Sequence, residues 1–329
     1  MKLNASYILN KYMTFFILLA LVILFSFFSK HFLTFMNIKN LITQNTYYIT
    51  AAIGLAFVMI GGGIDLSVGY QLSLVGVIYG ILITELGLPV PLAVASGFII
   101  GILLGMLNGV IITSIKVFPM IVTLATTTVF QGISYTLSQS KSFRPFPEDF
   151  RAITTANIAG IPFDILLALI IAFVAAYILQ KTYFGRYVMA VGGNREVARL
   201  SGINTRIITI AVYGICGLCT ALASMIMVSK SNTAASNMGP GIEFTCMTAA
   251  IIGGISFKGG KGTITSLICG VFIVQILGNG MQLAGWGVYS QYIAKGVILI
   301  IAVAMDSLKN MSFSRKIVKK QNDTVIKEK

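Results

Sequence analysis

The stretch Gly61-Gly62-Gly63-Ile64-Asp65-Leu66-Ser67-Val68-Gly69 separates two apolar runs of the chain, residues 46–62 and 67–84. Three glycines end the first run, and a carboxylate stands where the second begins. Apolar runs of about 20 residues cross the bilayer core as helices. The stretch therefore predicts a junction between two membrane-spanning helices.

Asp65 has two compatible interpretations. An acidic residue at this place caps the N-terminus of the following helix and opposes the positive end of its dipole. Beside mobile glycines, it also fits a hinge or gate on a permeation path. The gate candidates around it are Gly61, Gly62, Gly63 and Ser67.

The composition supports a membrane protein throughout. The chain has 329 residues, of which 56% are hydrophobic and 10% charged, whereas ordinary soluble domains have about 25% charged residues. We predict an all-α polytopic membrane protein with about ten transmembrane helices. The predicted spans are residues 12–29, 46–62, 67–84, 90–114, 118–138, 164–180, 207–228, 246–257, 263–283 and 288–306. The eighth, 246–257, is short enough to be half-inserted or broken.

The charge distribution predicts the orientation. With the N-terminus inside, the large majority of the 24 Lys and Arg residues fall on the inner side, as the positive-inside rule requires. We therefore expect residues 1–11 to be a cytoplasmic N-terminus, 12–306 a transmembrane domain and 307–329 a basic cytoplasmic tail near lipid head groups. The formal charge of +14 is explained by this pattern better than by nucleic-acid binding. No small-residue cleavage site follows the apolar run 13–28, so we expect a retained first span.

A second glycine turn echoes the first. Gly253 and Gly254 follow an isoleucine and precede a polar turn and a new span, as Gly61 and Gly62 do. We place them among the gate candidates. The later stretch Gly259-Gly260-Lys261-Gly262-Thr263 lacks the spacing of a phosphate-binding loop, so we expect a tight re-entry into the membrane.

A basic, turn-rich island covers residues 181–206 between two long apolar runs. Asn194 is a good N-cap for a short helix that Ser201-Gly202 would end. Two interpretations stay open, namely docking of a soluble partner and a helix lying on the membrane surface. The residues that would carry the docking are Gly185, Arg186, Asn194, Arg195, Glu196, Val197, Arg199, Leu200 and Gly202.

Several other residues give information about helix packing more than about chemistry. Gly97, Gly101, Gly105 and Gly109 share one helix face, which lets another helix approach closely. Cys216 and Cys219 lie in an apolar run without a second pair, so we expect packed small residues. The chain has one histidine, His31, so we expect neither a catalytic site nor a metal site. Lys295, within the last run, would snorkel to the membrane surface or line a polar cavity.

The chain resembles the membrane permeases of bacterial ABC importers for simple sugars, of the ribose-permease type. The resemblance rests on Gly61–Gly69, Asn108-Gly109, Thr123-Leu124-Ala125-Thr126, Gly185–Ile203, Ala249–Thr263 and Lys295-Gly296 through Asp306. It covers nearly the whole chain from the second span onward. It departs from the family pattern at Thr245, where an acid is usual, while Glu243 stands two residues earlier.

The resemblance implies a bacterial inner-membrane permease with a type II-like fold that works as a homodimer or heterodimer. Its partners would be a cytoplasmic ABC ATPase, which carries ATP and Mg²⁺, and an extracytoplasmic sugar-binding protein. The island 181–206 would be the coupling loop. This chain would hold no cofactor and would not be an enzyme.

The substrate stays open at this stage. A pentose or hexose is the leading hypothesis, and a furanone signal or a polyol is the alternative. An ion-coupled secondary transporter fits less well, because the acids near membrane depth all fall at predicted span ends. Polar residues in or near spans are the candidates for lining the pathway, although each could equally satisfy a neighbouring helix: Gln44, Asn45, Asn108, Thr123, Thr127 and Gln131.

Overall fold

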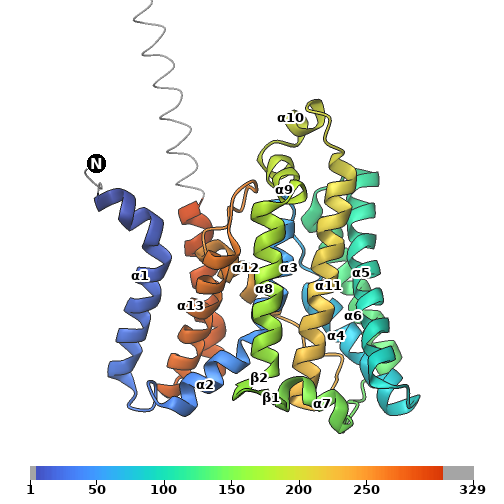
Figure 1. Cartoon of the computed structure of the whole chain (residues 1–329), viewed down its shortest axis with the longest axis vertical. Helices are drawn as coiled ribbons and strands as arrows, with labels where there is room; N and C mark the ends of the chain where they lie inside the picture. The colour runs from blue at the N-terminus through green and yellow to red at the C-terminus, as the bar shows by residue number, and fades with distance from the viewer. Residues whose placement is uncertain (1–4, 307–329) are drawn as a thin grey trace, which may run out of the picture.

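The computed structural model describes residues 5–306, and residues 5–13 by their backbone alone. The chain forms a bundle of helices that run roughly along one axis (Figure 1). Helix α10 projects from one end of the bundle, and α2, α7 and a short hairpin close the other end. The predicted cytoplasmic tail, 307–329, lies outside the described residues.

The elements follow the apolar runs closely. In chain order they are α1 Ala5–Phe28, α2 Phe35–Gln44, α3 Thr46–Ile60, α4 Val68–Gly80, the π-helix η1 Ile81–Glu85, α5 Val90–Ile115, α6 Pro119–Ser138, α7 Glu148–Thr155, β1 Asn157–Ile158, β2 Ile161–Pro162, α8 Phe163–Lys181, α9 Tyr183–Gly193, α10 Arg195–Leu200, α11 Thr205–Ser231, α12 Ile242–Ile252 and α13 Ile264–Leu283. A last helix spans Val288–Asp306.

Among the described residues, seven helices are long and apolar enough to cross a membrane, which confirms a polytopic membrane protein. They are Val68–Glu85, Val90–Ile115, Pro119–Ser138, Phe163–Lys181, Thr205–Ser231, Ile264–Leu283 and Val288–Asp306. The predicted count of about ten is not confirmed. The other three runs hold shorter helical segments: Thr14–Phe28 of α1, the 15-residue α3 and the 11-residue α12. The predicted span 246–257 is displaced, because α12 begins at Ile242 and ends at Ile252.

The glycine face of α5 packs against α11, which lies beside it in Figure 1. A Cβ added to Gly105 would lie 2.1 Å from the Tyr213 carbonyl oxygen, and one on Gly101 would lie 2.7 Å from the Gly217 carbonyl oxygen. Backbone therefore touches backbone, the close approach for which membrane helices use small residues. The predicted glycine face exists, and its partners are helices of the same chain: Gly101, Gly105 and Gly109 meet α11, and Gly97 meets the Tyr79 ring of α4.

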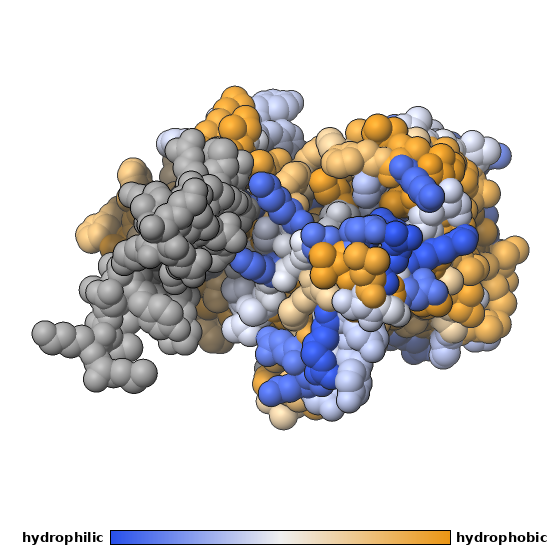
Figure 2. Space-filling model, turned by 90° about the horizontal axis from the view of Figure 1, so that it is seen from above, coloured by the Kyte–Doolittle hydropathy of each residue, from blue (hydrophilic) through white to orange (hydrophobic). Residues whose placement is uncertain are grey.

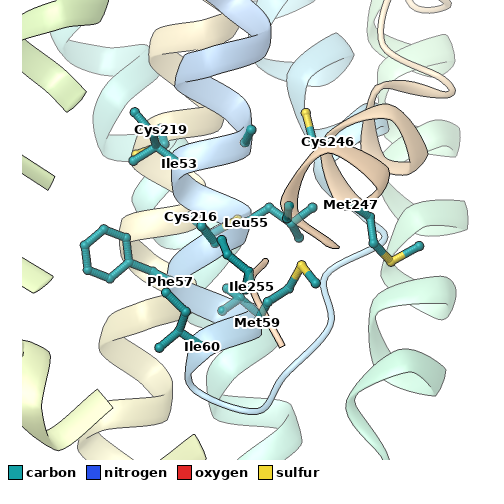
Figure 3. Close-up of a cluster of buried hydrophobic side chains, with 14 of the residues drawn as sticks. Ile53, Leu55, Phe57, Met59, Ile60, Cys216, Cys219, Cys246, Met247 and Ile255 are labelled. Carbon is teal, nitrogen blue, oxygen red and sulfur yellow. The ribbon is translucent and has the colours of Figure 1, made fainter. Parts of the chain in front are cut away.

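Helix α3 is the centre of the largest apolar cluster. Figure 3 shows its side chains, Phe57 and Met59 among them, packed among α11, α12 and the turn after α12. Cys216 and Cys219 of α11 are free and buried in this cluster. A Cβ on Gly54 would lie 2.7 Å from the Cys219 Cβ. The two cysteines act as the small packing residues that the sequence predicted.

The segment between α6 and α8 is a folded cap. It contains α7 and the two-stranded hairpin β1–β2, and Phe146 and Phe150 are buried with their rings stacked 4.9 Å apart. Ser229 Oγ donates to the Phe150 carbonyl oxygen at 2.9 Å. The segment is therefore packed against the end of α11.

A buried ion pair joins three helices near the same end. Asp164 at the start of α8 is 1% exposed. Its Oδ2 accepts from Lys230 Nζ of α11 at 3.2 Å and from Thr46 Oγ1 of α3 at 3.1 Å. Lys230 Nζ also donates to the Thr43 carbonyl oxygen. The pair fixes the end of α2 and the start of α3 against α8 and α11.

Candidate functional site

The segment Gly61–Ser67 is non-helical and lies inside the bundle between α3 and α4. Two of its carbonyl groups accept hydrogen bonds from side chains of other helices. The Ile64 carbonyl oxygen accepts from Tyr213 Oη at 3.0 Å and from Thr123 Oγ1 at 3.2 Å, and the Leu66 carbonyl oxygen accepts from Thr127 Oγ1 at 3.0 Å. Irregular backbone at membrane depth is tolerated only with such partners. Thr123 and Thr127 thus bond to the broken segment, one of the two roles that the sequence left open, and their place on a pathway stays a prediction.

Asp65 holds the bend before α4. Its Oδ1 accepts from the Ser67 backbone nitrogen at 2.9 Å and from Ser67 Oγ at 2.6 Å. Asn108 Nδ2 of α5 donates to Ser67 Oγ at 2.9 Å. The prediction that Asp65 caps α4 is wrong, because the helix begins at Val68 and its first turn makes no hydrogen bond with this carboxylate. Asp65, Ser67 and Asn108 form one buried network, so the candidates Asp65 and Asn108 belong together.

The two glycine pairs build the same helix end. After α3, the Gly62 nitrogen donates to the Met59 carbonyl and the Gly63 nitrogen to the Val58 carbonyl. After α12, the Gly254 nitrogen donates to Ile251 and the Ile255 nitrogen to Ala250. Gly62 and Gly254 have φ of 80° and 86°, the left-handed conformation that this C-terminal motif requires. The sequence echo between the two stretches is therefore also a structural one.

The end of α3 touches both the island and the turn before α13. A Cβ on Gly192 of α9 would lie 1.8 Å from the Ile60 carbonyl oxygen and 2.7 Å from the Gly260 nitrogen. The Gly260 nitrogen donates to the Ile60 carbonyl at 2.8 Å. A displacement of α9 would therefore press directly on the end of α3. Gly253 packs elsewhere, with its Cβ position 2.9 Å from the Leu267 Cα of α13.

The starts of α4 and α12 also meet. A Cβ on Gly239 would lie 1.9 Å from the Gly69 carbonyl oxygen, and the Gly239 nitrogen donates to Ser73 Oγ at 2.9 Å. Glu243 is buried here, and its Oε1 accepts from the Gly241 nitrogen at 3.0 Å. Glu243 thus serves the start of its own helix. Two helix N-termini facing each other inside a bundle are typical of transporters with broken helices.

The island 181–206 forms two short helices at the end of the bundle that carries α10. Asn194 Oδ1 accepts from the Glu196 and Val197 nitrogens, both at 3.0 Å, and Gly202 has φ of 83° after the helix end. The predicted cap and stop are confirmed. Helix α9 was missed, although Thr182 caps it by accepting from the Gly185 nitrogen at 3.3 Å; that threonine was the available signal.

Helix α10 presents apolar side chains on an exposed surface. Val197 and Leu200 are 57% and 77% exposed. Beside them Arg199 Nη2 donates to Glu196 Oε1 at 2.6 Å, and this bond raises the pKa of Arg199. Figure 2, viewed from this end, shows hydrophilic side chains gathered around a hydrophobic patch. An exposed apolar pair on a capped helix is suited to contact with another protein.

Two further island residues, Gly185 and Arg186, make close contacts within the chain. A Cβ on Gly185 would lie 2.1 Å from the Leu179 carbonyl oxygen, so this glycine permits the tight passage from α8 to α9. The Arg186 guanidinium lies 4.3 Å above the Tyr183 ring, a cation–π contact within α9.

Three adjoining cavities lie along the last helix, Val288–Asp306, and all three are lined by Lys295. Gln44 and Asn45 line one of them. The other pathway candidates, Asn108, Thr123, Thr127 and Gln131, lie on α5 and α6 and line none of the three. The six candidates thus fall into two separate places.

Among residues 14–306, no three His, Cys, Asp or Glu side chains gather to hold a metal ion.

Comparison with known proteins identifies the kind of molecule. The family described as the permease component of branched-chain amino acid transport systems matches residues 37–303. The D-allose transport system permease protein of Escherichia coli K12 is 34% identical over 91% of this chain and 92% of its own length. The ribose import permease protein of Haemophilus influenzae is 35% identical over 89% and 92%. The galactose/methyl galactoside import permease protein of Escherichia coli K12 is 32% identical over 89% and 93%.

No solved structure matches the chain. The relatives are transport permeases, which move solutes and catalyse no reaction themselves. The expectation that this chain is not an enzyme is therefore confirmed.

Proposed function

We propose that this chain, which belongs to the family of permease components described as branched-chain amino acid transport permeases, is the membrane-spanning subunit of an ATP-driven importer of a monosaccharide. The observation that carries the proposal is its similarity, over about nine tenths of the chain, to permeases named for allose, ribose and galactose. The branched-chain label belongs to the family as a whole, whereas these relatives are named for individual sugars.

The partner that supplies the energy would be a cytoplasmic ABC ATPase that binds ATP and Mg²⁺. The exposed pair Val197 and Leu200 would enter a groove on that subunit, and the basic residues Arg195 and Arg199 would meet acidic groups beside it. Movement of α9 would reach the end of α3 through Gly192, because these backbones are already in contact. An extracytoplasmic sugar-binding protein would deliver the solute to the opposite end. Both chain termini would face the cytoplasm, and two permease chains would act together.

The first experiment tests the ATPase partner. The chain is co-expressed with the ABC ATPase subunit proposed as its partner, and the complex is isolated through a tag on the permease. We expect Val197→Glu and Leu200→Glu to reduce ATPase recovery strongly, because a carboxylate cannot be buried in an apolar groove without a partner. Thr155→Glu, an exposed change on α7 at the other end of the bundle, is the matched control. Full ATPase recovery with both α10 variants would overturn the docking assignment.

The second experiment tests energy source and substrate class. Vesicles containing the complete transporter are given radiolabelled D-ribose, D-allose, D-galactose or a polyol. We expect sugar uptake that is lost on ATP depletion and survives an uncoupler. Uptake that the uncoupler abolishes while ATP is present would indicate an ion-coupled transporter instead. Uptake of the polyol alone would change the substrate class.

A further inference from the structure

The three cavities along Val288–Asp306 differ in chemistry. The first, of about 170 Å³, lies between the end of α2, the start of α3, the end of α13 and the last helix. The second, of about 550 Å³, lies beside the start of α12. The third, of about 250 Å³, is lined mostly by aliphatic side chains of α1, α13 and the last helix. Tyr48 and Gln291 line both the first and the second, and Thr248 lines both the second and the third.

The first cavity is lined mainly by amide side chains. They come from α2, the turn before α3, α13 and the last helix, and are Gln44, Asn45, Gln275, Asn279, Gln282 and Gln291. The rest of the lining is Leu41, Tyr47, Tyr48, Gly278 and Lys295. An amide both donates and accepts hydrogen bonds, so a ring of amides matches neighbouring hydroxyl groups, which also do both. Tyrosine rings offer apolar faces for the C–H groups between the hydroxyls.

Two of these amides have bonding groups left unused inside the protein. Asn45 is 1% exposed, and its Nδ2 has no hydrogen-bond partner among the described residues. Asn45 precedes α3 without capping it through its side chain, so its amide has no structural task there. The Gln275 Nε2 is also buried without a hydrogen bond of ordinary length in the described part of the chain, although its amide lies near enough to the Tyr48 hydroxyl to interact with it. Buried donors are normally satisfied, so these two atoms point to a ligand or to water.

The cavity is held open and covered by specific contacts. A Cβ on Gly278 would lie 3.6 Å from Gln291 Oε1, so this glycine leaves room between α13 and the last helix. Asn37 of α2 and Asn279 of α13 exchange two hydrogen bonds, both of 3.0 Å. This pair fixes α2 across the end of α13, where Figure 1 shows it. The amides are therefore placed on packed helices.

We propose that this cavity is a binding site for a neutral polyhydroxylated solute, with Asn45 and Gln275 as its buried hydrogen-bond donors and Lys295 as the group shared with the two cavities beyond. The proposal rests on the proposed function, and it names the residues that would recognise the sugar within the membrane. A neutral solute is favoured because six amides face one ammonium group and no carboxylate lines the cavity. Lys295 would donate to hydroxyl oxygens and repel cations.

The test compares solute uptake with ATP hydrolysis in the complete transporter in vesicles. We expect Asn45→Leu and Gln275→Leu to lower the uptake of D-ribose, D-allose or D-galactose about tenfold, since each removes a buried donor to the sugar. ATP hydrolysis stimulated by the binding protein should stay within about twofold, because these residues lie far from the island. Asn40→Leu, an exposed amide of α2 outside the cavity, is the control. Unchanged uptake, or a parallel loss of uptake and hydrolysis, would overturn the site.

A labelling experiment does not depend on transport by altered proteins. Gln291→Cys is made in a chain carrying Cys269→Ser, which removes the partly exposed native thiol. We expect a water-soluble thiol reagent to modify it and D-ribose, or whichever sugar the wild type carries, to slow the reaction at least threefold. Absence of modification would overturn the cavity as a solute site. If the wild-type transporter carries none of the sugars, both the proposed function and the assigned solute class are wrong. If the wild type takes up a sugar normally and the variants do so equally well, only the assigned site is wrong.

Discussion

The region around α3, α5 and α11 and the region around α12, α13 and Val288–Asp306 are both made of apolar helices, yet they are packed in opposite ways. In the first, glycines bring backbones into contact, and the buried hydroxyl groups of Thr123 and Tyr213 bond to the Ile64 carbonyl oxygen of the broken segment. In the second, three cavities run along a helix that is mostly exposed. A transport protein needs both, because a fixed frame must position a part that holds and releases the solute. The following changes test that division.

The largest difference in stability should come from replacing a glycine by alanine in each of the two regions. Gly105→Ala places a methyl group 2.1 Å from the Tyr213 carbonyl oxygen, which is backbone and cannot move aside. We expect a loss of about 3 kcal/mol, the upper end for an overpacked core, seen as a much lower unfolding temperature in detergent. Gly278→Ala places its methyl group 3.6 Å from Gln291 Oε1, so we expect a change below about 1 kcal/mol. Equal effects at both positions would remove the contrast.

The ion pair of Lys230 and Asp164 tests how the first region is closed at the end near α7. Lys230→Met leaves Asp164 buried without its counter-ion, and we expect a loss of about 3 kcal/mol, the low end for a broken buried pair, because 27% of the Lys230 side chain is exposed. The double variant Lys230→Met with Asp164→Leu should recover part of that loss, since no unpaired charge remains. Thermal unfolding of the three proteins measures it. A double variant less stable than Lys230→Met would contradict the argument.

The broken segment tests a smaller effect inside the frame. Thr123→Val and Tyr213→Phe each remove one of the two hydrogen bonds to the Ile64 carbonyl oxygen. We expect each single change to cost about 1 kcal/mol. The double change should cost more than the sum, because only then is the carbonyl left without a partner. Thr128→Val, whose hydroxyl bonds only within α6, is the control. Additive losses of stability would mean that neither hydrogen bond compensates for the absence of the other at the Ile64 carbonyl oxygen.

Much of the frame could be predicted from local pattern. The apolar runs gave the long helices to within a few residues, because apolar length alone identifies a membrane span. Spacing of four residues placed Gly97 to Gly109 on one face. Asn194 and Gly202 fixed the limits of α10, since cap chemistry depends only on neighbouring residues. Helices α2, α7 and α9 were missed, because short amphipathic helices are stabilised by contacts that a hydropathy run does not reveal.

The candidate site depended on contacts between distant residues and was predicted less well. Asp65 was expected to cap α4, but it bonds to Ser67 before the helix begins. For Thr123 and Thr127 the sequence left open whether they line a pathway or satisfy a neighbouring helix, and the structure adds that their hydroxyls bond to the carbonyls of Ile64 and Leu66. A polar residue in a span has the same appearance in sequence whether it bonds to a neighbouring helix or to a solute. Only the fold brings Gln275 and Gln291 to Asn45.

The smallest expected change in stability concerns the island, and it separates docking from folding. Asn194→Ala removes the cap of a six-residue helix, which costs about 1 kcal/mol locally and should leave the unfolding temperature of the bundle unchanged. Because so short a helix is not stable alone, fraying should weaken ATPase binding about fivefold, measured by titrating the purified ATPase into permease vesicles. Asn194→Asp keeps a capping oxygen and should bind like the wild type. If Asp weakens binding as much as Ala, the side chain of residue 194 contacts the ATPase itself, and the geometry of α10 is not what the partner requires.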